Sequence, residues 1–180
     1  IFSSELPSNP VGFYASSIEV LTDNIFTFPK ELSRYGEGIP YVYPPLGFYI
    51  SAILTYFTGS VISTMKYFPG IFHLIQSSIL FYFVYKWKSN FSYAKWSLVI
   101  FIFMPQVLVR DLYADGILTN LSKIFLLSSW VSCIIGGGGR KYYYSILGGL
   151  LVGASIVTHP IVGVLCAIGY PVILVSSKPE

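Results

Sequence analysis

Residues 117–136 read ILTNLSKIFLLSSWVSCIIG, an apolar stretch with a single charged side chain, Lys123. A helix needs about 20 such residues to cross the hydrocarbon layer of a membrane. Five further apolar runs occupy 45–64, 68–86, 94–110, 143–158 and 160–176. These runs are continuous rather than alternating, which argues against the strands of a lipid-facing β-barrel. The sequence therefore predicts an all-α, polytopic transmembrane helical bundle of about six spans.

The composition of the whole chain supports this prediction. Of the 180 residues, 54% are hydrophobic and only 11% are charged, whereas about 25% are charged in an average soluble protein. So few charges do not solvate the surface of a small domain. The formal net charge of +3 is too small, and too spread along the chain, for a nucleic-acid binder. Cys133 and Cys166 lie in apolar runs without a CxxC pattern, which predicts two small buried side chains.

The first 40 residues differ from the rest of the chain, because they hold five of the eight acidic residues. Within them, GFYASSIEVLTDNIF (12–26) places Phe13 and Leu21 near helical spacing, with Glu19 and Asp23 on another face. This pattern predicts an amphipathic helix at the membrane surface.

Two regions follow from this contrast: a membrane-surface loop with an amphipathic helix at 1–40, and a transmembrane helical region at 41–180. The chain opens on Ile1 without an initiator methionine and ends in SSKPE directly after an apolar run. It carries no signal-peptide pattern. We expect it to be part of a longer protein.

The basic residues predict an orientation. With six crossings, one side of the membrane receives the N-terminal segment together with Lys86, Lys88, Lys95, Arg140, Lys141 and Lys178. The opposite side receives Lys66 and Arg110. The positive-inside rule then makes residues 1–40 cytoplasmic.

Ionisable residues beside apolar spans are costly, so each is a candidate site. The strongest cluster is RDLYADG (110–116), in which Asp111 and Asp115 are four residues apart and share one face of a helical turn. Such a pair suits a divalent cation, or one carboxylate suits a general base. The alternative is a pair of loop charges, with Arg110 beside Asp111.

Two histidines lie in apolar surroundings. His159, in SIVTHPIVG, suits a hydrogen bond to a phosphate or a sugar, and its alternative role is to hold the turn before Pro160. The runs on either side of it form either a tight hairpin or one helix kinked at Pro160. His73 lies within a span and suits hydrogen bonding between helices.

A stripe of small residues marks the run 143–158. Ser145, Gly149 and Gly153 repeat at intervals of four, which predicts close contact with another helix along that face.

The segment GIPYVYPPLGFYISAIL (38–54) carries the most specific pattern. Pro44 and Pro45 stand at the mouth of an apolar helix, where the missing N–H groups cost nothing. Tyr43 and Tyr49 place aromatic rings around them, as is typical of a membrane interface. The pattern predicts a rigid entrance to a span, preceded by a polar loop that covers a site; the alternative is a simple helix start.

The order of these features resembles the membrane glycosyltransferases of the GT-C fold, in particular the branch related to dolichyl-phosphate-mannose–protein mannosyltransferases. In that family an outer loop with surface helices precedes a span that opens with YPPL or KPPL, here the motif 43–46. DGILTNLSKIFLL (115–127) is similar to the family's Gly-Leu-Thr stretch, and LVGASIVTHP (151–160) to its Leu-Thr-His-Pro stretch. The similarity covers most of the chain.

The resemblance implies transfer of a sugar from a polyprenyl-phosphate-linked donor at the outer face of a membrane, with the first loop outside. The family's catalytic acid in that loop corresponds to Asn9, which cannot act as a base, and the nearest acidic residue is Glu5. A second acidic residue corresponds to Asp111 or Asp115.

From the resemblance we expect the catalytic carboxylates among Asp111, Asp115 and Glu5, with a possible divalent metal ion. Donor binding is expected at Tyr43, Pro44, Pro45 and His159. The expected partners are a lipid-linked sugar donor and membrane lipids, without nucleic acid, in the plasma membrane of a prokaryote.

Two other functions fit the same residues. One is a fragment of a transporter or channel, in which Asp111, Asp115, His73 and His159 line a polar pathway. The other is a catalytically inactive GT-C-like scaffold, which the asparagine at position 9 favours.

Overall fold

The computed structural model describes residues 10–23, 43–105, 116–136 and 142–176. Within these ranges the chain forms helices and no strands, which confirms the all-α prediction. The helices are α1 (Pro10–Asp23), α2 (Leu46–Thr58), α3 (Val61–Lys88), α4 (Phe91–Phe103), α6 (Gly116–Gly136), α7 (Tyr142–Thr158) and α8 (Pro160–Ser176).

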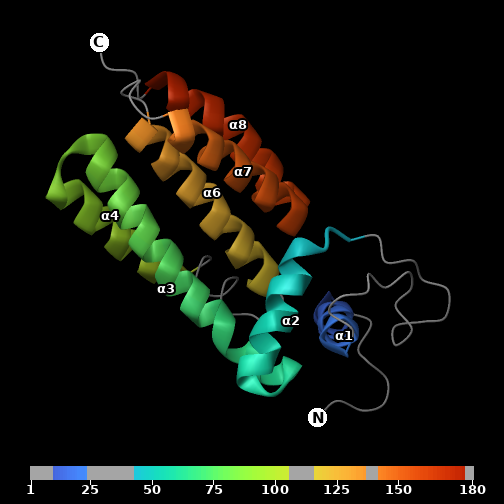
Figure 1. The fold of residues 1–180 in the computed structure, drawn as a ribbon. Coiled ribbons are helices and arrows are strands. Elements are labelled where there is room, and N and C mark those ends of the chain that lie inside the picture. Colours follow the sequence, from blue (N-terminus) through green and yellow to red (C-terminus); the bar gives the residue numbers. More distant parts are fainter. Residues whose placement is uncertain (1–9, 24–42, 106–115, 137–141, 177–180) are drawn as a thin grey trace.

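Five helices lie side by side and form a bundle (Figure 1). Helix α6 is central and packs against α3, α7 and α8, while α4 packs on α3. Helices α3 and α6 run in the same direction: the Asn120 side chain donates to the backbone carbonyl of Pro69 at 3.3 Å, and further along the Trp130 ring lies 5.8 Å from Phe83. The start of α3 therefore extends past the start of α6.

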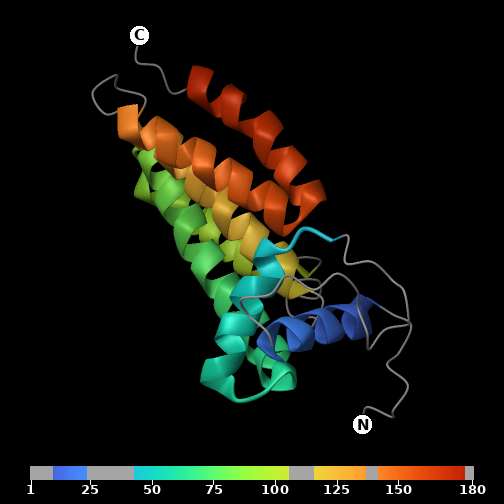
Figure 2. The same cartoon turned by 45° about the vertical axis from the view of Figure 1, so that its right-hand side comes forward.

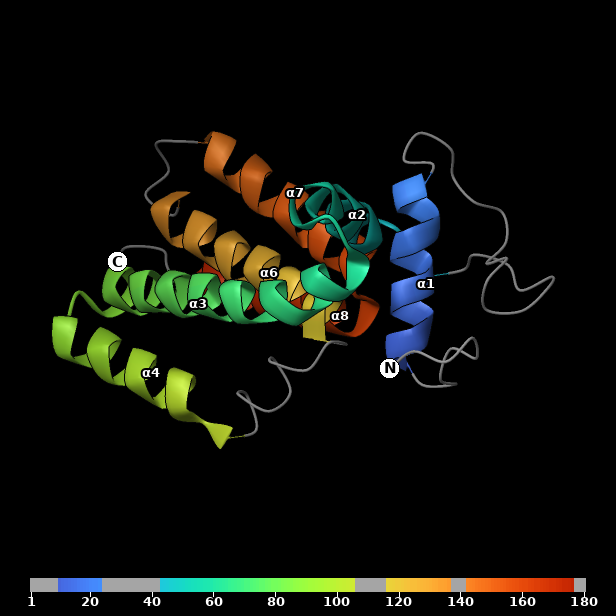
Figure 3. The same ribbon diagram turned by 90° about the horizontal axis from the view of Figure 1, so that it is seen from below.

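Helices α1 and α2 close one end of this bundle. Figures 2 and 3 show α1 lying across that end, with α2 between α1 and the other helices. The core at this end is fully or almost fully buried and consists of Ile18, Leu21, Phe48, Ala52, Met65, Phe72, Ile117, Leu118 and Leu121. The amphipathic helix predicted within 12–26 is thus confirmed as a helix, and its apolar face is buried against α2 and α3.

The first predicted span, 45–64, is not one continuous helix, because the chain turns at Gly59 and Ser60. Helix α2 ends at Thr58, and Gly59 adopts a left-handed φ of 74° with its N–H donating to the carbonyl of Thr55. Ser60 then caps α3 by accepting from the backbone N–H of Ser63 at 3.1 Å. Glycine after a helix and serine before one are the usual end and start signals. With 13 residues, α2 is about 20 Å long.

The other predicted boundaries agree to different degrees. The run 68–86 belongs to α3, which begins earlier and passes through Pro69. The run 94–110 overlaps α4, which begins earlier, at Phe91, and ends at Phe103; positions 106–110 of the run lie outside the described residues. Helices α6, α7 and α8 match their runs within one residue.

The alternatives left open around Pro160 are now resolved, because α7 and α8 form a tight hairpin. His159 lies between the two helices; its backbone N–H donates to Ser155 and its carbonyl accepts from Gly163, each at 2.9 Å. A Cβ atom on Gly163 would overlap the backbone of Ile156. The absence of a side chain at Gly163 therefore lets α8 fold directly back on α7.

The small-residue stripe on α7 does not make the predicted contact. No heavy atom lies within 4 Å of a Cβ built on Gly149 or on Gly153. The close approach occurs one position away, where a Cβ on Gly148 would lie 2.7 Å from the ring of Tyr170. A shift of one residue turns the contact face by about 100°, and that shift leaves Gly149 and Gly153 facing open space.

Two smaller predictions concern buried side chains. Cys133 and Cys166 are buried free thiols, as predicted. His73 is buried in α3, and its ring stacks on Phe101 of α4 at 5.2 Å, so it joins two helices through ring contact.

We expect Gly163→Ala to lower the free energy of unfolding by about 1–3 kcal/mol, because the added methyl group overpacks the hairpin. Gly149→Ala is the matched control: its methyl group meets nothing within 4 Å, and alanine is favoured over glycine in a helix interior by about 0.5–1 kcal/mol. Thermal unfolding of both variants in the same detergent measures the difference. Equal stability of the two variants would contradict the hairpin packing.

Candidate functional site

The Tyr-Pro-Pro-Leu motif lies where α2 begins, at the end of the bundle that α1 covers. Pro45 already has helical backbone angles, φ −85° and ψ −21°, and its carbonyl accepts from the N–H of Tyr49 at 3.0 Å. A Cβ on Gly47, the second residue of the helix, would lie 2.6 Å from Leu118 and 2.9 Å from Thr158. The missing side chain at Gly47 therefore lets the start of α2 pack closely against α6 and α7.

Tyr43 stands in a cluster of aromatic rings contributed by α1 and α2. Its ring centroid lies 6.1 Å from Phe13, 6.0 Å from Tyr14 and 5.4 Å from Phe48. The pairs are edge-to-face, the arrangement that the ring quadrupole favours. This cluster fixes the Tyr43 ring between the surface helix and the bundle.

The environment of Tyr43 also changes its acidity. Burial, the larger cause, and a hydrogen bond with the Tyr14 side chain both raise the pKa of the Tyr43 phenol well above its usual value of 10.0. The phenol therefore stays protonated and keeps its O–H as a hydrogen-bond donor at alkaline pH.

His159 completes the cluster from the α7–α8 turn. Its ring centroid lies 6.4 Å from that of Tyr43, and its side chain is buried. Tyr43 and His159 were both predicted as donor-binding residues, and the structure brings them together although they are far apart in the sequence. Pro44 and Pro45 lie next to Tyr43 and shape the backbone there.

The predicted catalytic residues lie elsewhere in the chain. Glu5, Asp111 and Asp115 are outside the described residues, as is Asn9. Within the described ranges, no three histidine, cysteine or acidic side chains come together as a metal site.

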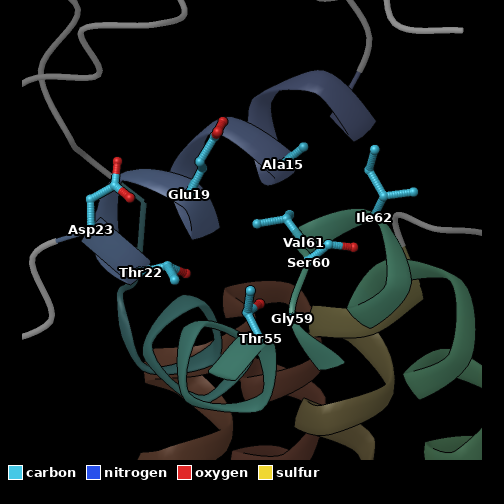
Figure 4. Close-up of a pocket in the computed structure, with 9 residues that line it drawn as sticks. All are labelled: Ala15, Glu19, Thr22, Asp23, Thr55, Gly59, Ser60, Val61 and Ile62. Carbon is cyan, nitrogen blue, oxygen red and sulfur yellow. The ribbon is translucent and has the colours of Figure 1, made fainter. Parts of the chain in front are cut away.

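A pocket of about 420 Å³ lies between α1 and the α2–α3 turn (Figure 4), a volume within the usual range of small-molecule sites. We call it the α1 pocket. It is lined by Ala15, Glu19, Thr22, Asp23, Thr55, Gly59, Ser60, Val61 and Ile62. In Figure 4 the Glu19 and Asp23 carboxylates lie at its rim, and Thr22, Thr55 and Val61 project toward the hollow.

Helix α1 is held over this pocket by a polar contact with α2. The Tyr56 hydroxyl donates to the backbone carbonyl of Thr22 at 2.8 Å. On the opposite wall, the Thr55 and Thr64 hydroxyls lie 3.1 Å apart and join α2 to α3.

The lining of the α1 pocket combines two kinds of surface. Carboxylates accept hydrogen bonds from hydroxyl or ammonium groups, and the threonine hydroxyls donate or accept. Ala15, Val61 and Ile62 add apolar walls. A ring with polar edges and apolar faces, such as a sugar, matches this combination.

No pattern in the sequence marks the α1 pocket. Glu19 and Asp23 were assigned to the outward face of an amphipathic helix, and their spacing of four residues was the available signal. Thr55, Gly59 and Ser60 lay inside a predicted span, so nothing marked them as part of a site.

Comparisons with protein-family models, with curated proteins and with solved structures found no match.

We expect Tyr14→Phe to lower the pKa of Tyr43 toward its usual value, because the substitution removes the hydrogen bond that helps to raise it. The NMR signals of Cζ-labelled tyrosines, followed through an alkaline titration, report each phenol, and Tyr43→Phe assigns the signal. The raised pKa means that the folded protein holds this proton more tightly than the unfolded chain. Its contribution to stability is therefore complete below pH 10 and is lost as the pH rises through the raised pKa. A Tyr43 signal that titrates at the usual value in the unsubstituted protein would contradict the described cluster.

Proposed function

We propose that the chain is part of a membrane glycosyltransferase of the GT-C kind, which moves a sugar from a polyprenyl-phosphate-linked donor to an acceptor. The observation that carries the proposal is the meeting of Tyr43, from the Tyr-Pro-Pro-Leu motif, with His159, from the Thr-His-Pro motif, beneath the surface helix α1. The sequence resemblance rests on these same two motifs. Their convergence at the start of α2 supports a shared site.

The lengths of two helices support insertion in a membrane. From Pro69 to its end at Lys88, α3 is about 30 Å long, and the 21 residues of α6 span a similar distance. Both match the thickness of the hydrocarbon layer. These are the two described helices that are long and apolar enough to cross it, and the other apolar helices are shorter. We infer that the shorter bundle helices α4, α7 and α8 also lie within the membrane.

The surface of the bundle supports the same conclusion. In the most apolar part of α3 only 33% of the residues are buried, which favours contact with lipid over the enclosed core of a soluble domain. Large apolar side chains stand exposed along the bundle, among them Ile71, Leu74, Ile100, Phe103, Leu150, Leu165 and Ile168. A soluble monomer rarely exposes so much contiguous apolar surface.

The lysines orient this membrane protein differently from the sequence-based expectation. Lys86, Lys88 and Lys95 lie where α3 ends and α4 begins, at the end of the bundle away from α1 (Figure 1). Because α2 caps the bundle instead of crossing beside it, α1 and these lysines belong to opposite faces. The positive-inside rule then places α1 and the Tyr43–His159 cluster outside. This orientation agrees with the outer first loop that the resemblance implies.

The proposed transfer reaction assigns a role to each of these side chains. An acceptor hydroxyl gives its proton to a carboxylate, and its oxygen attacks the anomeric carbon of the donor sugar. The bond from that carbon to the phosphate oxygen breaks, and the lipid phosphate leaves with the bonding electrons. The His159 ring would donate a hydrogen bond to that phosphate, where negative charge develops, and the Tyr43 hydroxyl would do the same by exchanging Tyr14 for the phosphate as its acceptor. Asp111 and Asp115 remain the proposed source of the base, with Glu19 and Asp23 lining the acceptor side.

A transporter or channel fragment is the second candidate. Gln76 is fully buried in α3, and no described residue hydrogen-bonds its amide, which favours a polar path at this depth. Other buried polar groups pair across helices instead: the Ser122 and Ser155 hydroxyls lie 2.8 Å apart between α6 and α7. The activity assay below separates the two candidates.

We expect the full-length protein, reconstituted in liposomes, to transfer radiolabelled sugar from an undecaprenyl-phosphate hexose to an acceptor. Tyr43→Phe and His159→Gln should each lower kcat/KM, by up to about 100-fold, because each removes a donor to the leaving phosphate. Tyr67→Phe is the control, since Tyr67 is exposed on α3 and away from the cluster. Glu19→Gln should raise the KM for the acceptor and leave the KM for the donor unchanged.

Asp111→Asn and Asp115→Asn test the proposed base in the same assay, and one of them should abolish transfer. Activity that is unchanged in Tyr43→Phe and His159→Gln would contradict the proposed site. A folded protein that transfers no hexose from any polyprenyl phosphate would contradict the enzymatic function.

A further inference from the structure

A second pocket lies at the opposite end of the bundle, between the end of α3 and the start of α4. Its volume is about 400 Å³, and it is lined by Val84, Trp87, Lys88, Tyr93 and Ser97. We call it the lysine pocket. It is separate from the Tyr43–His159 cluster and has no role in the transfer reaction described above.

The lysine pocket has a polar mouth and a more apolar floor. Helices α3 and α4 run in opposite directions around the turn at Ser89 and Asn90. Lys88 and Tyr93 therefore lie near the turn, while Val84 and Ser97 lie one helical turn deeper. The polarity of the pocket thus decreases with depth, as it does in a membrane from the charged headgroups to the hydrocarbon.

The charge at this end is one-sided. Lys86, Lys88 and Lys95 gather there, whereas the carboxylates of the described residues, Glu19 and Asp23, are on α1 at the other end. Such an excess of positive charge attracts anions, and anionic lipids of the inner leaflet are the most abundant anions at this depth.

Lys88 is held in position by an aromatic ring. Its Nζ atom lies 4.2 Å from the centroid of the Trp87 ring, a cation–π distance. The first backbone N–H groups of α4 are already occupied, since the Asn90 side chain accepts from Ser92 and Tyr93 at 2.9 and 3.2 Å. An anion in the pocket would therefore be bound by side chains: the Lys88 ammonium and the hydroxyls of Tyr93 and Ser97.

We propose that the lysine pocket binds the phosphate group of an anionic membrane phospholipid, with its acyl chains lying along the exposed apolar face of α3 and α4. The inference rests on insertion of the bundle in a membrane, which is part of the proposed function. Both Trp87 and Trp96 are exposed, but only Trp87 lines the pocket, so the two rings distinguish bound lipid from bulk lipid.

The test is quenching of tryptophan fluorescence by brominated lipid in vesicles of phosphatidylcholine that contain a small fraction of phosphatidylglycerol. The bromine atoms are carried either by the anionic or by the zwitterionic lipid, at equal mole fraction. We expect the anionic lipid to quench more strongly. That excess should disappear in Trp87→Phe and persist in Trp96→Phe.

Lys88→Gln should lower the preference for the anionic lipid about fivefold, the usual effect of one lysine at a membrane surface. Lys66→Gln, at the other end of α3, is the matched control and should leave the preference unchanged. Equal quenching by the two lipids would overturn the lysine pocket as a headgroup site while leaving membrane insertion intact. Absence of quenching by either lipid would overturn insertion and the site together.

A final arm separates a lipid headgroup from a free anion. Millimolar inorganic phosphate should not remove the excess quenching beyond the effect of sodium chloride at the same ionic strength. Displacement by inorganic phosphate alone would show a site for free anions and would overturn the lipid assignment.

Discussion

The turn at Gly59 and Ser60 is the constraint on which the arrangement of the chain depends. Gly59 takes the left-handed backbone conformation that ends α2, and Ser60 caps α3 immediately afterwards. Because α2 stops there, it stays at one end of the bundle together with α1. This placement buries the apolar face of α1, forms the α1 pocket and brings Tyr43 to His159. It also puts the N-terminal helix and the lysines of α3 and α4 at opposite ends.

Close backbone approach and small polar contacts hold the bundle together. Gly47, Gly148 and Gly163 each occupy a position where a Cβ atom would meet a neighbouring helix. Ser122 and Ser155 join α6 to α7 through their hydroxyls. A hydrogen bond of this kind contributes about 0.6 kcal/mol in a membrane. The close packing around the glycines therefore contributes much of what determines which helix faces meet. This mode of association leaves large apolar side chains outside, which is costly in water and favourable in lipid.

The sequence predicts the helical class and the longest helices because their apolar runs are continuous and about 20 residues long, too long for strands. It does not predict the break in the run 45–64, since Thr58, Gly59 and Ser60 lower the hydrophobicity of the run only slightly. The break depends instead on the left-handed backbone conformation of Gly59. In the proposed orientation, this break puts α1 on the side opposite to the one that the positive-inside count predicts. The motifs around Tyr43 and His159 identify two residues that meet in the structure. The pockets depend on how the helices pack against one another, which no local pattern encodes. Residue spacing also does not fix the rotation of α7 about its axis, so it does not predict that Gly148, rather than Gly149, makes the contact with α8.

The sidedness of α1 relative to the lysine end tests the central claim most directly. Single substitutions Asp23→Cys, Ile62→Cys and Ser92→Cys place reactive thiols at exposed positions, while the native Cys133 and Cys166 are buried. With a membrane-impermeant maleimide on intact cells, we expect labelling at positions 23 and 62, and at position 92 only after the membrane is permeabilised. Labelling of 23 and 92 from the same side, with 62 on the other, would show that α2 crosses the membrane and would contradict the account.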